Sequence, residues 1–211
     1  MLANPFSYIN KTDDINKTEG IVIRSHHSGE SDLVIKMLSP EYGKIAVFAK
    51  HARSSKKRFS GNIEILDKGV FQFKIKPGNR ANNNLYVIEN FYPLKSIHTF
   101  RSNLLKLSIA SLLCESFDLI IKEDQDSSHI SAQYYEAFCM GIDALEESTT
   151  NNDLLKVCFL TLKALVCIAG FLEVERAPVP NMKNLRIILN HIENCLEKRL
   201  MTRSEFEKLI P

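Results

Sequence analysis

Short apolar segments separated by turn residues fill the first half of the chain after residue 18. They are rich in β-branched residues, and each has the length of a β-strand. The segments are residues 20–25, 32–39, 44–50, 69–76 and 85–91. In the fourth, Phe71, Phe73 and Ile75 fall on one face, and Val70, Gln72, Lys74 and Lys76 on the other. Five strands at this spacing predict a small barrel.

The pattern changes after Pro93, where apolar residues recur at spacings of three and four. Helices are predicted over residues 104–120, over 131–145, from Asn152 or Asp153 to about Ile168, and over about 182–209 with a break near 201–203. The fold class is therefore α+β. We expect a weakly structured extension (1–18), a five-stranded barrel domain (19–95) and an α-helical domain (96–211).

One helical stretch, residues 154–172, is long enough to cross a membrane but contains Lys156 and Lys163. A lysine near the bilayer centre costs about 2.5–3.5 kcal/mol, so a mostly buried core helix is the better interpretation. The N-terminus has no basic segment followed by an apolar run, which argues against a secretory signal. The sequence thus predicts no membrane association and a cytoplasmic location.

Five cysteines occur in apolar helical stretches, and none forms a CxxC pair. Without that spacing, neither a zinc knuckle nor a redox pair is expected, and buried thiols are the interpretation. HExxH, GxSxG, P-loop and GxGxxG motifs are also missing. We therefore expect no catalytic residues, no cofactor and no metal, and favour a binding module over an enzyme.

The net charge of +2 hides an asymmetry between the two halves. Residues 1–95 hold 15 Lys or Arg against 9 Asp or Glu, and residues 96–211 hold 12 against 16. The segment from Lys50 to Arg58 has five cations in nine residues and no acid. It predicts either a site for a polyanion, of which phosphate is the commonest, or a solvated loop without function.

Nucleic-acid phosphates are the expected partner, because small barrels commonly bind single strands in basic grooves with stacking aromatics. The candidate phosphate contacts are Arg24 (which could instead lie on the barrel's rim), Lys44, Lys50, Arg53, Lys56, Lys57 and Arg58. Phe48, Phe59 and Tyr86 are candidate stacking groups, although each is better explained as core of a small barrel.

Several short elements together resemble the start of the RecO family of bacterial recombination and repair proteins. They are Glu19-Gly20-Ile21-Val22-Ile23-Arg24, Gly29-Glu30-Ser31-Asp32, Gly43-Lys44, and Ala49-Lys50 with Ala52-Arg53. Looser similarity continues through residues 159–165, Gly170-Phe171-Leu172 and 196–206.

The resemblance implies an N-terminal OB-fold barrel and a helical C-terminal domain. It also implies a strand-annealing recombination mediator in DNA repair that binds single- and double-stranded DNA. Such a protein acts with RecR, binds the acidic tail of the single-stranded-DNA-binding protein, and helps load RecA onto DNA coated by it. We therefore expect a monomer associated with the nucleoid.

Two departures from the family pattern bear on this expectation. Residues 173–180 contain no Cys where many members carry a four-Cys zinc site, so no zinc is predicted. His51 replaces a usual Gly and must tolerate φ > 0 if the turn is kept. A tail-binding pocket would need basic residues on the early helices, of which the candidates are Arg101, Lys106, Lys122 and Lys163.

Two other functions remain open on the sequence. The chain could be a protein-interaction scaffold whose basic loop serves solubility or an acidic protein. It could also be an RNA-binding barrel, for example in translation or ribosome assembly.

Overall fold

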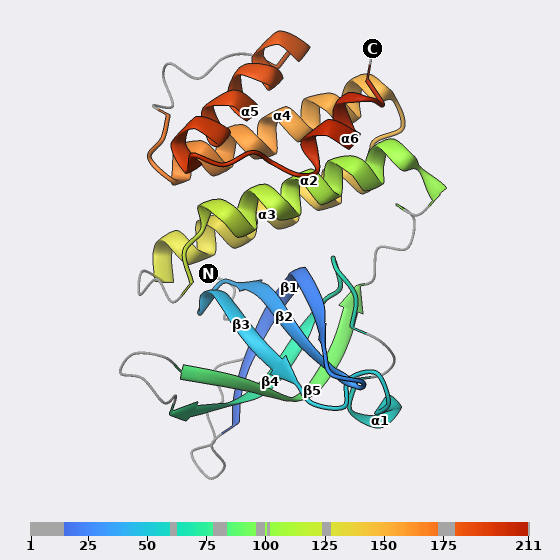
Figure 1. Ribbon diagram of the computed structural model, residues 1–211, viewed down its shortest axis with the longest axis vertical. Coiled ribbons are helices and arrows are strands. Elements are labelled where there is room, and N and C mark those ends of the chain that lie inside the picture. The colour runs from blue at the N-terminus through green and yellow to red at the C-terminus, as the bar shows by residue number, and fades with distance from the viewer. Residues whose placement is uncertain are drawn as a thin grey trace, which may run out of the picture.

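The protein consists of a β-barrel below a layer of helices, as the computed structural model shows (Figure 1). It describes residues 15–59, 63–77, 84–95, 100, 102–123, 128–172 and 180–210. The strands are β1 (Ile15–Ser28), β2 (Asp32–Ser39), β3 (Gly43–Ala49), β4 (Lys68–Pro77) and β5 (Asn84–Lys95), and a short helix α1 (Lys56–Phe59) lies between β3 and β4. The predicted five strands are all present.

The strands close in the order β1-β2-β3-β5-β4, which is the topology of an OB-fold. All neighbours are antiparallel except β3 and β5, which pair in parallel through Val47 with Tyr86 and Phe48 with Val87. The expected α+β fold, a five-stranded OB barrel followed by helices, is therefore confirmed.

The barrel begins four residues earlier than predicted, because β1 starts at Ile15 and pairs with β4 from Lys74 onward. The expectation that residues 15–18 belong to a weakly structured extension is wrong. Thr18 explains the error: it is buried, and its hydroxyl lies 2.7 Å from Ser39 Oγ. When a buried position holds a polar residue that hydrogen-bonds to a distant partner, the sequence lacks the apolar residue that would have indicated a strand there. Residues 1–14 lie outside the described part.

Aromatic side chains fill the barrel, as the period-two pattern of β4 predicted. Phe71 and Phe73 are fully buried, and the rings of Phe71 and Phe91 are 4.6 Å apart. Gly69 permits this packing, because a Cβ there would lie 2.4 Å from the Tyr92 carbonyl oxygen. The core is thus a filled barrel with no room for a ligand along these residues.

The helices are α2 (Leu104–Ile120), α3 (Ser128–Glu147), α4 (Asn151–Ile168), α5 (Met182–Leu196) and α6 (Arg203–Glu207). The helix predicted over residues 131–145 begins three residues earlier and ends two later, and two other predicted boundaries were wrong. The cap of α4 is Thr150, whose hydroxyl accepts from the Asp153 N–H. The last helical region breaks at Glu197, which adopts φ 51°, because α5 ends there in a left-handed residue.

Three of the five cysteines are buried as predicted: Cys114, Cys139 and Cys158. Burial raises the pKa of the Cys114 and Cys158 thiols to about 12 and that of Cys139 to about 11. Cys167 is half-buried and Cys195 is exposed on α5, so the expectation of a buried thiol is wrong for Cys195. The reason is that its helix carries only a narrow apolar face against the core.

Within the described ranges, no three His, Cys, Asp or Glu side chains gather as metal ligands would. The segment with the missing cysteines, residues 173–179, lies outside them. Every helix in the described part is too short or too polar to span a bilayer.

Candidate nucleic-acid interface

The basic segment folds into a turn at one end of the barrel, against the turn between β1 and β2. His51 stands at φ 56°, and its N–H donates to Asp32 Oδ1 at 2.7 Å. This hydrogen bond lowers the pKa of Asp32. The His51 carbonyl accepts from the N–H groups of Ser54 and Ser55. His51 thus keeps the left-handed turn that the family resemblance led us to expect for glycine.

Two arginines of the segment fix this turn to the rest of the barrel. Arg53 donates from Nη1 to the Glu30 carbonyl at 2.9 Å. Arg58 donates to the carbonyls of Glu89 and Ile88, each at 2.7 Å, and to that of Lys50 at 3.2 Å. The guanidinium of Arg58 is therefore used inside the protein, and its predicted role as a phosphate contact is not supported by this geometry.

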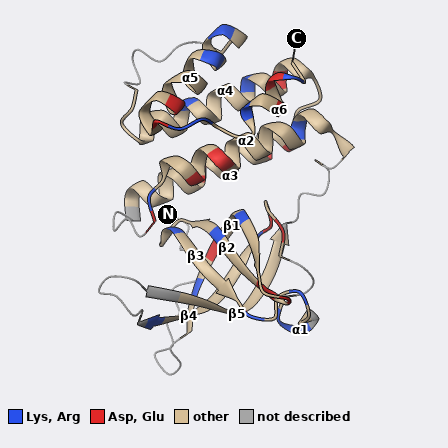
Figure 2. Cartoon of the chain, viewed as in Figure 1, with Lys and Arg blue, Asp and Glu red and all other residues tan. Residues whose placement is uncertain are grey.

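Three cations of the segment are exposed to solvent, including Arg53 despite its hydrogen bond to the Glu30 carbonyl. Lys50, Arg53 and Lys57 are exposed, and none of the three makes an ion pair among the described residues. The side chain of Lys56 lies outside the described part. Figure 2 shows the Lys and Arg positions of this turn beside α1, at the side of the barrel away from the helical layer. We call Lys50, Arg53 and Lys57 the loop cations.

Phe48 provides an aromatic ring on the outer face of the barrel, on the strand that precedes the loop cations. Phe48 is half-buried and pairs with Val34 on β2 and Val87 on β5. Phe48 is flanked by the buried Val47 and Ala49, so alternation along the strand places its ring on the outer face of the barrel, two residues before Lys50 in the turn. Of the candidate stacking groups, Phe48 alone has this placement, since Phe59 and Tyr86 are buried in the core.

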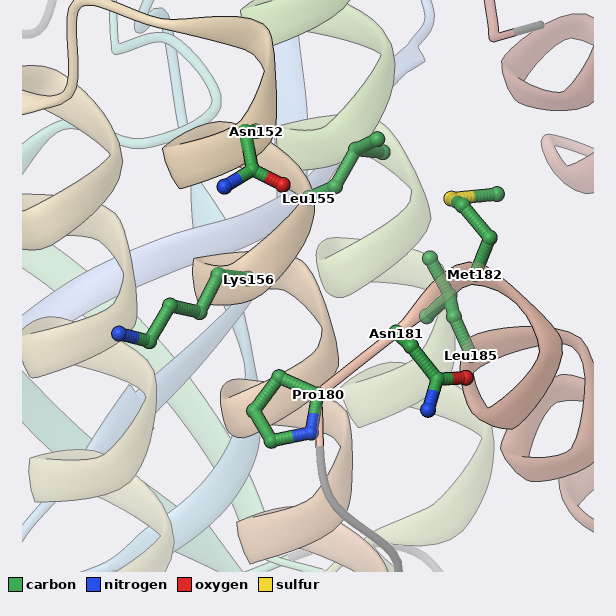
Figure 3. Close-up of a pocket in the computed structure, with 7 residues that line it drawn as sticks. All are labelled: Asn152, Leu155, Lys156, Pro180, Asn181, Met182 and Leu185. Carbon is green, nitrogen blue, oxygen red and sulfur yellow. The ribbon is translucent and has the colours of Figure 1, made fainter.

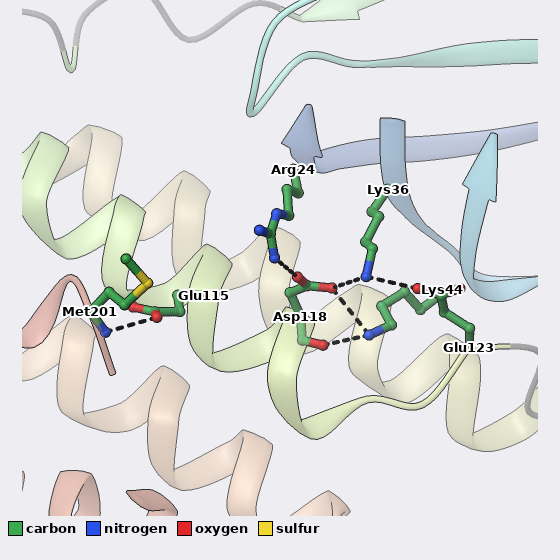
Figure 4. Close-up of polar contacts among 7 residues, drawn as sticks. All are labelled: Arg24, Lys36, Lys44, Glu115, Asp118, Glu123 and Met201. Atoms are coloured by element: carbon green, nitrogen blue, oxygen red, sulfur yellow. Dashed lines mark hydrogen bonds and ion pairs between the residues drawn. The ribbon is translucent and has the colours of Figure 1, made fainter. Parts of the chain in front are cut away.

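The other two predicted phosphate contacts lie at the junction with the helices (Figure 4). Arg24 donates from Nη1 to Asp118 Oδ2 at 2.9 Å, and its side chain remains 59% exposed. Lys44 is only 4% exposed and its Nζ lies 3.1 Å from Asp118 Oδ1. Lys36, which the sequence did not single out, lies 3.2 Å from the same oxygen and 2.8 Å from Glu123. We call Arg24, Lys36 and Lys44 the junction cations.

Lys44 also caps a helix. Its ammonium donates to the backbone carbonyl of Asp118, which is among the terminal carbonyls that α2 leaves without an intrahelical partner. A cation is favourable at this negative end of the helix dipole. The ammonium of Lys44 is thus buried and bound to Asp118, a geometry that does not favour the predicted contact with DNA.

Burial and charge act in opposite directions on the pKa values of this cluster. Burial raises the pKa of Asp118, but the hydrogen bond from Arg24 and the charges of Lys44 and Lys36 outweigh it and hold the pKa below its usual value. Lys44 has a lowered pKa because burial outweighs the attraction of Asp118. An acid next to the buried Phe117 on an apolar helix face was the sequence signal for this cluster.

The helical layer contains a cavity of about 300 Å³ between the start of α4 and the start of α5 (Figure 3). Its lining residues are Asn152, Leu155, Lys156, Pro180, Asn181, Met182 and Leu185. The basic residues predicted for a tail-binding pocket do not line it. Lys106 donates to the Glu146 carbonyl instead, Lys122 is exposed elsewhere, Lys163 is half-buried, and Arg101 lies outside the described residues.

Residues 14–96 match the family model "Recombination protein O N terminal". The DNA repair protein RecO of Listeria monocytogenes serotype 4b is 30% identical over 116 residues, which are 55% of this chain and 43% of that protein. The RecO protein of a Thermoanaerobacter species is 32% identical over 114 residues, covering 54% and 44%.

A longer match reaches into the helical layer. The RecO protein of Caldanaerobacter subterraneus subsp. tengcongensis is 27% identical over 158 residues, covering 75% of this chain and 59% of that protein. The matched segments thus span about half the length of these relatives. In the sequence of its N-terminal barrel, the chain is similar to proteins of the RecO family.

Proposed function

We propose that this protein is a non-enzymatic DNA-binding protein of recombination and repair that holds single strands on its barrel and promotes their annealing. The observation that carries the proposal is the turn that follows β3, where three exposed cations make no ion pair among the described residues, next along the chain to the half-buried Phe48. Relatives that match the barrel are named for DNA repair, which supports the same role.

The arrangement suits a backbone-binding surface. Lys50, Arg53 and Lys57 supply positive charge to phosphates, and Phe48 supplies a ring on which any base can stack. Lys56 is a fourth candidate on the same turn. Four neutralised phosphates on a single strand give a log–log salt slope of about −2.8. No helix of the barrel is placed to read base edges, so sequence specificity should be low.

Neutralising phosphates is also a route to annealing. Two complementary strands repel each other through their backbones, and a protein that screens one strand lowers this barrier without breaking a covalent bond. The same surface binds duplex DNA through its phosphates. On this basis we propose double-stranded DNA as a second ligand.

The partners in this proposal follow from the similarity to the RecO family. They are RecR, the acidic tail of the single-stranded-DNA-binding protein, and the process that loads RecA onto coated DNA. The cavity beside Lys156 is our candidate for the tail, because one cation and two carboxamides border an apolar floor of Leu155, Met182 and Leu185. Replacing Lys156 by Glu should weaken binding of a labelled acidic peptide and leave oligonucleotide binding unchanged.

Fluorescence anisotropy with a labelled single-stranded oligonucleotide over a series of NaCl concentrations tests the DNA site. The variant Lys50→Glu/Lys57→Glu should bind more weakly and lower the salt slope by about 1.4, or 0.7 for each lost phosphate contact. Arg58 is left intact because it anchors the turn. The matched control is Lys183→Glu/Arg186→Glu, which makes the same charge change at exposed positions of α5.

The result also separates the other functions. Equal weakening by both variants would show that net charge, not this surface, drives binding, and would overturn the assignment. A scaffold predicts no binding by the wild-type protein at low salt. An RNA-binding barrel predicts a preference for RNA of one sequence over DNA, which a phosphate-binding surface should not show.

A further inference from the structure

The barrel meets the helices through polar contacts on two different helices. On α2, Asp118 binds the junction cations. On α3, the Tyr135 hydroxyl donates to Glu19 Oε1 at 2.7 Å. The same carboxylate lies 3.1 Å from Lys68 Nζ, and this ammonium lies 5.6 Å from the centre of the Tyr135 ring. We call these two groups of contacts, around Asp118 and between Tyr135 and Glu19, the polar anchors. Each joins the barrel to a different helix.

Apolar contacts surround these anchors. Ile21, Ile23 and Leu38 of the barrel are buried in one cluster with the helices. Apolar burial holds two surfaces together but has no preferred direction, whereas a hydrogen bond requires defined distances and angles. Two polar anchors on separate helices therefore determine the angle at which the barrel is held.

The first anchor is continuous with the proposed DNA surface. Lys36 pairs with Ala46 in the sheet, one outward position along β3 from Phe48. Lys50 follows the end of β3, and the outward positions of the strand are then Phe48 and Ala46. Ala46 pairs with Lys36, and the ammonium of Lys36 contacts Asp118 and Glu123. A strand that follows the face from the loop cations thus runs toward the helices, and the angle of the barrel determines where it arrives.

We propose that the Lys44–Asp118 and Tyr135–Glu19 contacts are positioning contacts that fix the barrel at one angle to the helices. Their role, which rests on the proposed function, is to direct a strand bound at Phe48 toward the helical layer. Lys44 and Asp118 act through this angle and do not touch DNA. The pair is buried on both sides, so it is retained when DNA is bound.

Single-molecule energy transfer in the full-length protein tests the angle directly. One dye is placed on Cys195, which is exposed, and the other on Glu30→Cys, an exposed position at the far end of the barrel, with Cys167→Ser to avoid a third label. The wild-type background should give one narrow distribution. Asp118→Asn/Tyr135→Phe should give a broad or shifted one.

The matched control is Tyr42→Phe, which removes a hydroxyl that donates to Asn16 within the barrel. It should leave the distribution narrow and unshifted. A narrow, unshifted distribution in folded Asp118→Asn/Tyr135→Phe would overturn the proposal, because apolar burial would then suffice to set the angle.

A second variant tests the proposal if Asp118→Asn/Tyr135→Phe fails to fold. Lys44→Met/Asp118→Leu replaces the buried ion pair by apolar side chains, a change that proteins often tolerate without losing stability. Broadening in this folded variant supports the proposal, and a distribution as narrow as that of the wild-type protein contradicts it. Circular dichroism and the unfolding midpoint establish that each variant is folded.

The proposed role in directing a bound strand is tested by DNA binding and strand annealing. In Asp118→Asn/Tyr135→Phe the anisotropy Kd for a single strand should be unchanged, while the rate of strand annealing falls about tenfold, a size typical of coupling between sites. Unchanged annealing despite a broadened distribution would overturn this part. If the wild-type protein binds no DNA, the proposed function fails, and the energy-transfer result still decides whether the contacts fix the angle.

Discussion

The two sets of cations on the barrel have the same charge and opposite surroundings. The junction cations meet Asp118, and Lys44 among them is buried. The loop cations are exposed and lack ion pairs among the described residues. A cation that is buried and paired stabilises the fold, whereas an exposed, unpaired one is available to a polyanion. The comparison shows that residue type and position in a motif do not separate the two roles.

The largest expected difference between the two sets is in stability, and the same substitution measures it at both places. Lys44→Met should lower the free energy of unfolding by about 3 kcal/mol, the low end of the range for breaking a buried pair, because Asp118 keeps Arg24 and Lys36. Lys57→Met should change it by no more than about 0.5 kcal/mol. Urea unfolding followed by circular dichroism gives both values, and equal effects would remove the distinction.

The next effect concerns pH and Asp118. Its folded-state pKa is lowered, so its contribution to stability is present above the unfolded value of about 3.9 and is lost as pH falls through the folded-state pKa. Asp118→Asn should cost about 2 kcal/mol near neutral pH, the size of hydrogen bonds to a charged group. This difference from wild type should shrink below about pH 4. A difference that stays constant from neutral to acidic pH would contradict the ion-pair assignment.

The smallest effect on stability is expected in the turn that carries the loop cations, where His51 adopts φ 56°. Valine is poorly suited to this left-handed region, whereas glycine adopts it freely. His51→Val should therefore be less stable than His51→Gly by about 1–2 kcal/mol. Thermal unfolding of the two variants measures the gap. If valine is tolerated as well as glycine, the turn does not require its left-handed residue.

Local patterns were sufficient to predict most of the fold. Alternation of Phe71, Phe73 and Ile75 predicted a strand with a buried face, and the spacing of residues 104–120 predicted α2 at its observed bounds. These predictions succeed because strands and helices place side chains at fixed periods. Thr18 was missed because its partner, Ser39, is 21 residues away and satisfies it by a hydrogen bond.

The site was less predictable, because its contacts join residues that are far apart in the sequence. Lys44 and Asp118 are 74 residues apart, and their contact depends on how two domains pack. Arg58 was missed as an anchor because its partners are backbone carbonyls, which carry no sequence signal. Lys50, Arg53 and Lys57 were identified because exposure and absence of acids are local properties of the segment. Their contact with DNA stays a prediction.

Acetylation of lysines followed by mass spectrometry tests the central claim most directly, with and without a single-stranded oligonucleotide. Lys50 and Lys57 should react quickly in the free protein and become protected when the oligonucleotide is bound. Lys44 should react slowly in both states, since its ammonium is buried against Asp118. Fast reaction of Lys44 that the oligonucleotide suppresses, with Lys50 and Lys57 unaffected, would contradict the account.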